Sequence, residues 1–482
     1  MFDLRPVGYV IGLLVAMLGA TMLLPMMLDL IDGTGHWSAF FVSAVITVLS
    51  GGLVSLSCHN GRGQGLSLQQ TFLLTTGVWL ALPFFAAMPF MMGVTEARFV
   101  DAFFEAMSGL TTTGSTVLSG LDVMPRGMLL WRGLLQWLGG IGIIVVAMVF
   151  LPELRVGGMQ IFKSEGFDTM GKILPRATEI SSRISVIYVA LTMACALSYV
   201  IAGLTPFDAL VHSMTTVATG GFANYDASFG AFPPGSEYVA VLFMILAALP
   251  FVRFVQLTAG TAKPLLKDSQ IRVFLMTALV IVAMLAGWQF LANGVRSEEG
   301  MRKVVFNSVS ILTGTGYASA DYMLWGGFPV AVLFFTGLIG GCAGSTACSI
   351  KVFRYQLLFA SIKAQLHKIQ HPSGVFAARY QGRKIDDDVL SSVMSFFVFF
   401  TVTLGALAVL LGMTGLDFVT ALSGAAAAIA NIGPGLGDTI GPSGNFASLN
   451  DAAKWLLTIG MLIGRLELLA VYVLFTVQFW RA

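Results

Sequence analysis

Long apolar runs separated by short polar segments dominate this chain. Ten runs are long enough to cross a hydrocarbon core of about 30 Å, which takes about 20 helical residues. They cover residues 7–28, 37–56, 71–92, 128–151, 184–202, 238–255, 273–291, 328–358, 389–411 and 455–480. The first run is long and no small-residue cleavage site closes it, so we expect a retained helix rather than a signal peptide. The pattern predicts an all-α polytopic membrane protein that begins with a two-helix hairpin.

Four shorter apolar segments alternate with the last eight runs. They cover residues 100–110, 206–217, 304–312 and 416–430. A helix rises about 1.5 Å per residue, so segments of this length cannot cross the membrane. Each must enter and leave by the same face. We therefore expect four units, each with an outer helix, a re-entrant pore helix and an inner helix.

A glycine-centred loop follows each re-entrant segment, and an aspartate follows each loop. The loops read TTTGSTV around Gly114, ATGGF around Gly220, LTGTGY around Gly314 and NIGPGLG around Gly433, and the acids are Asp122, Asp226, Asp321 and Asp438. The recurrence predicts pseudo-fourfold symmetry around one pore. The expected divisions are a hairpin at 1–66 and pore repeats at 67–155, 156–262, 263–372 and 373–482, the third with a broken inner helix.

The four loops predict a cation filter. Irregular backbone cannot face lipid, so loops at membrane depth must be shielded by protein or line a watery path. Backbone carbonyls can replace the hydration shell of a monovalent cation, and glycine permits the positive φ that aligns them. The expected ligands are Thr112, Thr113, Gly114, Ala218, Thr219, Gly220, Leu312, Thr313, Gly314, Asn431, Ile432 and Gly433. The four aspartates are expected to concentrate cations at the pore mouth. The alternatives are glycines that serve close helix packing and aspartates that are solvated caps.

Composition and charge support a membrane protein. Hydrophobic residues make up 56% of the chain and charged residues 11%, against about a quarter charged in soluble domains. The net charge of +2 gives no reason to expect a nucleic-acid partner, and the four cysteines lack the spacing of a metal site. Of 27 lysines and arginines, 19 fall in the connections between repeats and near the termini, including Arg62, Arg155, Lys163, Lys172 and Arg176. The positive-inside rule makes that face cytoplasmic, together with both termini.

The third inner run contains the candidate gate. Its sequence GLIGGCAGSTACSIK, at residues 337–351, is a poor helix interior, because glycine costs about 1 kcal/mol relative to alanine. We expect a break, with Gly340, Gly341, Gly344, Ser345 and Thr346 as gate residues. Close packing of small residues is the alternative. A phosphate-binding loop is disfavoured, because no Gly-Lys-Ser/Thr follows and no strand precedes the segment.

Arg465 is the second gate candidate. It lies about ten residues into the last inner run, where a charge costs at least about 2.5–3.5 kcal/mol in lipid. Glu467 is two residues away and faces another side of the helix, so a local pair is not expected. We favour a pore-facing arginine that hinders cations, with a structural ion pair to another helix as the alternative. His212, inside a re-entrant segment, is expected to be packed or hydrogen-bonded rather than a proton carrier.

The most specific marks are TTTGST at 111–116, TVATGGF at 216–222, LTGTGY at 312–317 and NIGPG at 431–435. In this order they resemble the Trk/Ktr/HKT superfamily of potassium transporters, specifically the bacterial TrkH-type membrane subunit, over nearly the whole chain. The resemblance implies one filter glycine per repeat, here Gly114, Gly220, Gly314 and Gly433. Glycine rather than serine at the first position implies potassium over sodium. A pore-facing arginine and an intramembrane loop beneath the filter are also implied.

The same resemblance implies the cellular context. It predicts a multi-pass protein of the bacterial inner membrane, a homodimer, and a cytosolic ring partner with Rossmann-type domains that bind NAD or ATP/ADP. The polar segment at 363–388 is the expected docking surface. The bound cofactor would be potassium in the filter, with no organic cofactor. A gated potassium-selective pore is the favoured function, a proton- or sodium-coupled potassium symporter the alternative, and no constellation of an enzyme is apparent.

Overall fold

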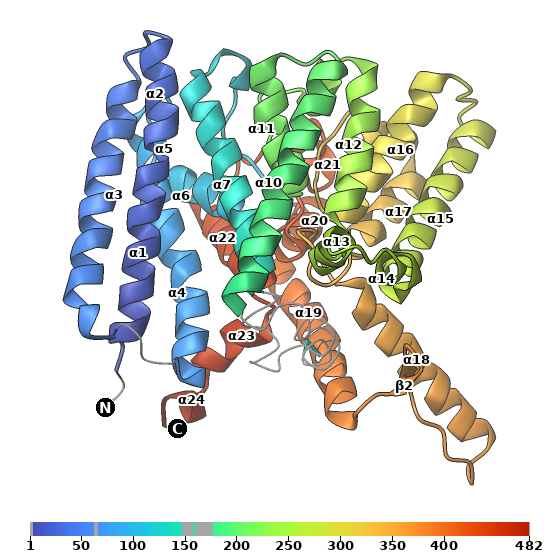
Figure 1. The fold of residues 1–482 in the computed structure, drawn as a ribbon. Helices are drawn as coiled ribbons and strands as arrows, with labels where there is room; N and C mark the ends of the chain where they lie inside the picture. The colour runs from blue at the N-terminus through green and yellow to red at the C-terminus, as the bar shows by residue number, and fades with distance from the viewer. Residues whose placement is uncertain (1–2, 62–65, 147–157, 160–176, 482) are drawn as a thin grey trace.

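The computed structural model describes residues 3–61, 66–146, 158–159 and 177–481. In these residues the regular structure is helical apart from one hairpin of two short strands, β1 (Arg379–Tyr380) and β2 (Arg383–Lys384). The helices form an upright bundle, and both ends of the chain lie at the end from which α18 (Val352–Gln370) projects (Figure 1). Arg62, Arg155, Lys163, Lys172 and Arg176, which entered the charge count, lie outside the described residues, as do residues 147–151 of the fourth predicted run.

The amino-terminal hairpin stands at one side of the bundle (Figure 1). It consists of α1 (Arg5–Thr21), α2 (Leu23–Ile31), α3 (Trp37–Ser57) and the 3-10 turn η1 (His59–Gly61). Its connecting turn is tied to the first repeat by Asp29, which accepts a hydrogen bond from the Gly127 amide at 2.8 Å, and by an ion pair between Asp32 and Arg126. The side chain of Arg126 also donates a hydrogen bond to Asp32, which lowers the pKa of the Asp32 carboxyl.

Four repeats follow the hairpin. The first contains α4 (Leu68–Ala86), α5 (Met88–Met92), α6 (Phe99–Leu110), η2 (Leu121–Val123) and α7 (Arg126–Val145), and the second contains α10 (Ala177–Ile201), α11 (Pro206–Val217), η4 (Ser228–Ala231), α12 (Pro234–Ala247) and α13 (Phe251–Thr258). The third contains α14 (Lys263–Lys267), α15 (Ser269–Leu291), α16 (Glu298–Thr313), η5 (Tyr322–Trp325), α17 (Gly327–Gly337) and α18, and the fourth contains α19 (Asp387–Met413), α20 (Phe418–Ala430), α21 (Gly437–Ile440), α22 (Asp451–Arg465), α23 (Leu469–Tyr472), η6 (Val473–Phe475) and α24 (Val477–Arg481).

The pore helices α6, α11, α16 and α20 end close to the predicted positions. Side chains of Thr205, Ser297 and Asp417 cap the amino ends of the last three by accepting a backbone hydrogen bond. At the carboxyl ends the chain turns into left-handed backbone within two residues. α16 is longer than expected because it begins at Glu298, before the apolar segment starts.

Three of the four inner helices are interrupted. The break predicted in the third inner run is confirmed, because α17 and α18 are separated by residues 338–351, here called the intramembrane loop. Two further interruptions were not predicted: α12 and α13 meet at 88°, and α22 meets the following segment at 105°. The described residues contain seven helices long and apolar enough to span a membrane, or up to nine when each bent pair counts once. The broken pair α17 and α18 corresponds to the remaining predicted run, at 328–358.

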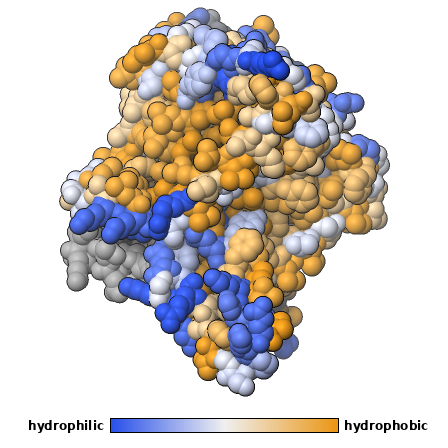
Figure 2. Space-filling model, turned by 90° about the vertical axis from the view of Figure 1, so that its right-hand side faces the viewer, coloured by the Kyte–Doolittle hydropathy of each residue, from blue (hydrophilic) through white to orange (hydrophobic). Residues whose placement is uncertain are grey.

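Apolar side chains cover the outside of the bundle. Figure 2 shows them as a broad hydrophobic area, with hydrophilic residues gathered toward the two ends. On α19 alone, Val398, Val402 and Val409 are each more than 60% exposed. Such a surface suits a lipid environment, and together with the apolar helices it makes the chain a multi-pass membrane protein.

Candidate functional site

The four glycine loops share one backbone course. Each leaves its pore helix through a left-handed residue, with φ of 52° at Thr112, 50° at Thr219, 74° at Gly314 and 52° at Asn431. Two residues later each loop has a glycine: Gly114, Gly221, Gly316 and Gly433. The first three of these glycines also have positive φ, between 79° and 88°. The shared conformation therefore aligns the loops residue by residue.

This alignment corrects the register expected in two loops. Gly221 and Gly316 occupy the position of Gly114 and Gly433, whereas the predicted Gly220 and Gly314 lie one and two residues earlier. The predicted Ala218 and Leu312 accordingly fall at the ends of their pore helices, before the left-handed residue. Loops 1 and 4 have the predicted register. The error arose because loops 2 and 3 each contain two glycines, and the sequence alone did not show which one follows the left-handed turn.

The aligned glycines contact one another around a closed ring. A side chain on Gly114 would collide with the Gly220 carbonyl, and one on Gly221 with the Thr315 carbonyl. A Cβ on Gly316 would lie 2.7 Å from the Gly433 nitrogen, and one on Gly433 would lie 3.0 Å from the Gly114 oxygen. Loop 1 thus meets loop 2, loop 2 meets loop 3, loop 3 meets loop 4, and loop 4 meets loop 1. The missing side chains are what allows four backbones to converge.

One cavity of about 440 Å³ opens above this ring. All four aligned glycines line it, together with Ser115, Thr116, Arg132, Phe222, Asp226, Ser228, Asn445 and other residues of the connections that follow the loops. The cavity is lined by polar and apolar surface alike, unlike the apolar crevice between α17 and α20. Backbone groups of four repeats therefore face a single polar chamber.

Side chains brace the loops from behind. Gln136 of α7 donates to the Gly220 carbonyl at 2.6 Å and accepts from the Phe222 amide at 3.0 Å, so it holds loop 2 on both sides of Gly221. Asn431 donates to the Thr113 hydroxyl at 3.0 Å, which joins loop 4 to loop 1. Paired threonine hydroxyls recur within loops 1 and 3: Thr111 with Thr113 at 2.7 Å, and Thr313 with Thr315 at 2.8 Å.

A buried ion pair stands beside loops 1 and 2. Arg132 of α7 donates to Glu105 of α6 at 2.9 Å, and both side chains are almost fully buried. The guanidinium also donates to the Ala223 carbonyl at 2.7 Å and lies over the Phe222 ring. Thr116 donates to the Glu105 carboxylate at 3.0 Å. The arginine therefore lines the chamber without adding net charge to it.

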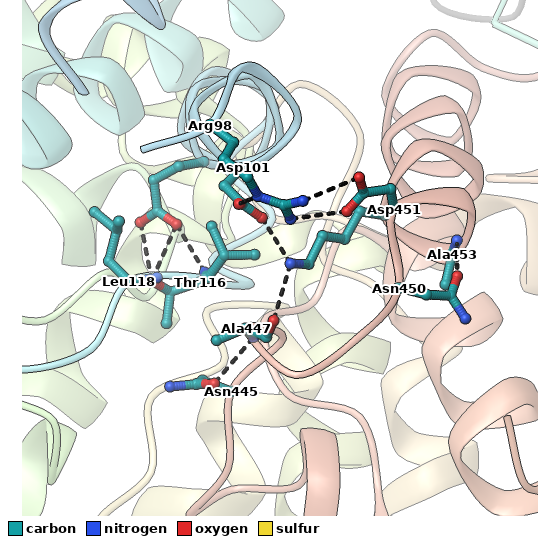
Figure 3. Close-up of polar contacts among 12 residues, drawn as sticks. Arg98, Asp101, Thr116, Leu118, Asn445, Ala447, Asn450, Asp451 and Ala453 are labelled. Carbon is teal, nitrogen blue, oxygen red and sulfur yellow. Dashed lines mark hydrogen bonds and ion pairs between the residues drawn. The ribbon is translucent and has the colours of Figure 1, made fainter. Parts of the chain in front are cut away.

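Charged residues also join the first repeat to the last. Figure 3 shows Arg98 between Asp101 and Asp451. The ammonium group of Lys454 donates to Asp101 at 2.6 Å and to the Ala447 carbonyl at 2.9 Å. Arg98 and Asp101 belong to the start of α6, whereas Asp451 and Lys454 belong to α22. Lys454 is only 2% exposed. This cluster is named the 4–1 seam below.

The four predicted mouth acids have different surroundings. Asp226 lines the chamber and accepts hydrogen bonds from the amides of Gly120 and Leu121. Asp122 accepts from the Asp226 amide at 3.3 Å, and Asp321 accepts from the Met323 amide at 3.0 Å at the start of η5. Asp438 lies exposed in α21. Turn capping thus accounts for much of their geometry.

The intramembrane loop lies directly beneath the four loops. Thr346 donates to the carbonyls of Val217 and Ala247 at 3.0 and 3.1 Å, and the Phe251 amide donates to Gly344 at 3.0 Å. Gly340, Gly341 and Ser345 form hydrogen bonds within the loop or to the start of α18. All five predicted gate residues in this segment are buried. The loop therefore closes the space under the ring.

Arg465 contacts the same loop from the opposite side. Its side chain is buried, its Nη1 lies 3.1 Å from the Cys348 sulfur, and its Nε and Nη2 have no hydrogen-bond partner. The Cys348 sulfur lies 3.5 Å from the Thr112 hydroxyl. Cys348 was not predicted as a site residue, because a lone cysteine among small residues carries no distinguishing pattern. It connects Arg465 to the base of loop 1.

Other buried charges near Arg465 already have partners. Glu467 forms an ion pair with Arg354 of α18, so it leaves Arg465 unpaired, and no other carboxylate forms an ion pair with Arg465 in the described part of the chain.

His212 of the pore helix α11 has partners on both sides, because both ring nitrogens are hydrogen-bonded to backbone atoms. The expectation that His212 is packed rather than free is confirmed.

Comparisons with known proteins agree with one another. The model of the TrkH family, described as a cation transport protein, matches residues 36–481. The Trk system potassium uptake protein TrkI of Halomonas elongata is 43% identical over 99% of this chain and 97% of its own length, and TrkH of Escherichia coli K12 is 35% identical over 99% of both chains. The crystal structure of the potassium transporter TrkH from Vibrio parahaemolyticus aligns with a TM-score of 0.91 at 32% identity over 100% of both chains. With a match of this extent in sequence and in fold, the chain belongs to the TrkH family of cation transport proteins.

Proposed function

We propose that this chain is the ion-conducting membrane subunit of a Trk-type potassium uptake system. The observation that carries the proposal is the closed ring of four aligned glycines beneath one polar chamber. Its relatives in Halomonas elongata and Escherichia coli are named Trk system potassium uptake proteins, which agrees with it. Potassium would enter the chamber, lose water in the ring and leave toward the cytoplasm when the gate moves.

The filter would be built from backbone oxygen. Carbonyls around a ring can replace the hydration shell of potassium, and the carboxyl ends of four pore helices direct partial negative charge toward the same centre. With the aligned register, the proposed ligands are the carbonyls of residues 112–114, 219–221, 314–316 and 431–433. Asp226 is the acid best placed to attract cations, since it lines the chamber. The Glu105 partner keeps Arg132 from opposing them.

The gate would be the intramembrane loop together with Arg465. The loop would fill the space under the ring, and the guanidinium of Arg465, whose Nε and Nη2 have no hydrogen-bond partner, would place a positive charge on the same path. A buried charge without a carboxylate is costly unless water reaches it. A water-filled open state would therefore favour movement of both groups, and we infer that the arrangement in this structure is the closed, resting one.

The coupled symporter is the competing function, because it needs an ionisable group that can carry charge within the membrane. Glu105 beside loops 1 and 2, and Glu467 after α22, are both ion-paired with arginines. A carboxylate that is paired in this way is better suited to holding helices together than to carrying protons or sodium. A channel mechanism therefore fits the arrangement better.

Reversal potentials would test the function directly. The purified full chain is reconstituted in liposomes, and potassium, rubidium, sodium and proton gradients are varied independently. A Nernstian response to potassium, with little response to protons or sodium, is expected. A reversal potential that follows the pH or sodium gradient at fixed potassium would replace the channel by the symporter. Equal responses to potassium and sodium would contradict the filter.

The projecting helix α18 is the proposed docking surface for a cytosolic regulator. Phe359, Ile362, Leu366 and Ile369 repeat at helical spacing on it and are between 45% and 66% exposed. Lysines and arginines follow in the segment 363–388. A ring protein with Rossmann-type domains that bind NAD or ATP/ADP is the expected partner. Leu366→Glu should then abolish stimulation of flux by the regulator while regulator-independent flux stays unchanged.

The remaining context is proposed on the same family basis. We expect a homodimer in the bacterial inner membrane with both termini in the cytoplasm. The projecting α18 and both chain ends lie at one end of the bundle, as that orientation requires (Figure 1). Light scattering of the purified protein would measure the dimer, and cysteine labelling from either side of the membrane would locate the ends.

A further inference from the structure

Each pore helix carries one polar side chain that accepts a hydrogen bond from the backbone just beyond its loop. Glu105 accepts from the Val117 amide at 2.9 Å, and His212 accepts from the Asn224 amide at 3.3 Å. Asn307 accepts from the Ser319 amide at 3.3 Å, and Ser423 accepts from the Leu436 amide at 2.9 Å. These four acceptors are named the loop staples.

The four stapled amides are equivalent positions. Each belongs to the third residue after an aligned glycine: 117 after Gly114, 224 after Gly221, 319 after Gly316 and 436 after Gly433. In the first three repeats the acceptor precedes its amide by twelve residues, and in the fourth by thirteen. Because the contact recurs once in each repeat at the same position, it is a structural feature of the whole ring and not of one loop.

A second interaction fixes the orientation of three staples. Glu105 is held by Arg132 at 2.9 Å, and Nδ1 of His212 bonds to the Asp208 carbonyl at 2.9 Å. Nδ2 of Asn307 donates to the Lys303 carbonyl at 2.8 Å. Because Nε2 of His212 accepts from a backbone amide, the ring is the neutral tautomer with its proton on Nδ1. Each side chain therefore presents an acceptor, and not a donor, to the stapled amide.

The staples are buried and chemically unlike one another. Glu105, His212 and Asn307 are completely buried, and Ser423 is 4% exposed. They are a carboxylate, an imidazole, an amide and a hydroxyl, so the shared feature is the accepting lone pair. A buried amide that loses its acceptor is left with an uncompensated polar group. Its segment would shift to find another partner, and the glycine carbonyl three residues before would shift with it.

We propose that Glu105, His212, Asn307 and Ser423 are positioning residues that set the spacing of the filter carbonyls and thereby the preference for potassium over sodium. The inference rests on the proposed function of the loops as a potassium filter. It adds four residues that never touch the ion and that act through the backbone. In each repeat a different side-chain group would hold the ring through a hydrogen bond at the same backbone position.

Ser423 offers the cleanest test, because its hydroxyl can be removed with little change in volume. In Ser423→Ala the Leu436 amide loses its acceptor, and the potassium-to-sodium permeability ratio should fall about tenfold, which corresponds to about 1.4 kcal/mol between the two ions. Ser423→Thr keeps the hydroxyl and should restore the ratio. The apolar crevice beside Ser423 leaves room for the added methyl group.

Ser108→Ala is the matched control. Ser108 lies in the pore helix α6, is completely buried, and its hydroxyl has no hydrogen-bond partner. Its removal should leave the permeability ratio unchanged. Should Ser423→Ala fail to fold, Asn307→Leu removes the equivalent acceptor in the third repeat, and Gln289→Leu, at a buried glutamine of the outer helix α15, is its control.

The outcomes separate this inference from the proposed function. If the unchanged protein shows no preference for potassium, the filter itself is wrong. If the unchanged protein is selective but Ser423→Ala and Asn307→Leu keep its permeability ratio, the staples do not position the filter. A fall in total flux at constant ratio would also overturn the inference, because it would indicate only a loss of active protein.

Discussion

The four outer loops and the intramembrane loop occupy neighbouring levels of the proposed pathway, yet their contacts are distributed differently. The outer loops pack closely against one another around the full ring, and each is also held by its own pore helix. The intramembrane loop bonds mainly to the second and third repeats, through Ala247, Ala248, Phe251 and Gln270. Toward the fourth repeat, the described residues of the loop form one hydrogen bond, between Cys348 and Arg465, and Ala343 packs in an apolar cluster with Val389 and Val393.

This difference indicates which part can move. To displace one outer loop would break contacts with both neighbours at once, so the ring favours one conformation. The intramembrane loop could swing away from α22 and still keep its bonds to the second and third repeats. A filter must hold its spacing, whereas a gate must alternate between two states, and the contacts of the two regions suit these two demands.

The largest effect is expected from breaking the ion pair of the outer region. Glu105→Ala leaves the buried Arg132 without its counter-charge, which costs about 3–5 kcal/mol. Folded protein should be largely lost, as judged by size exclusion and thermal unfolding. Asp451→Ala breaks an exposed pair with Arg98 and should cost less than about 1 kcal/mol. Equal stability of the two variants would contradict the distinction.

A substitution in the second loop would test the aligned register. Gly221 has φ of 79° and faces the Thr315 carbonyl, whereas Gly220 has no positive φ and faces the side chain of Gln136. Gly221→Ser therefore adds backbone strain of about 1–3 kcal/mol in the ring itself. Its potassium-to-sodium permeability ratio should fall more than that of Gly220→Ser. The reverse order would restore the register expected from the sequence.

Removal of the charge below the ring should open the inner region. Arg465→Ala is expected to raise potassium flux without the regulator by about tenfold, the effect of about 1.4 kcal/mol on a barrier. Arg465→Lys keeps the charge and should keep flux low. Unchanged or lower flux for the alanine variant, at equal amounts of folded protein in liposomes, would instead assign Arg465 a structural role.

The smallest effect is expected at the contact between the loop and Arg465. Cys348→Ala removes the sulfur that lies 3.1 Å from Nη1 of Arg465. The proposed closed state loses about 1 kcal/mol of stabilisation, so flux should rise about fivefold. The permeability ratio should stay constant, because the ring is untouched. Cys342→Ala provides the control, because Cys342 is also buried in the same loop and its amide donates to the Ala248 carbonyl of the second repeat. A changed potassium-to-sodium permeability ratio in Cys348→Ala would instead show that the intramembrane loop and the outer loops act as one unit.

The sequence predicted the elements of the pore well because length alone decides them. A segment such as 206–217 is too short to span a membrane, and it ends where glycine permits the chain to turn. The bend between α12 and α13 could also have been predicted, since Pro250 lies there and removes a backbone donor. The bend after Arg465 could not, because it depends on the ion pair of Glu467 with the distant Arg354.

The register of the loops had a signal in the sequence that spacing would have revealed. Asp226, Asp321 and Asp438 each follow their aligned glycine by five residues, an equality that Gly220 and Gly314 do not give. The loop staples had no such signal. A glutamate, a histidine, an asparagine and a serine share no residue type, and only the folded backbone places their acceptors at one equivalent position.

The 4–1 seam has a consequence for how the protein is assembled during translation. Neighbouring repeats are joined by peptide bonds at three of the four junctions, but the first and the last meet only through non-covalent contacts such as those of Lys454 with Asp101 and of the Phe446 amide with the Thr116 carbonyl. A nascent chain that ends before residue 431 lacks the fourth loop and therefore has an open-sided ring. If the ring is the proposed filter, ion selection can begin only after the last repeat has been made.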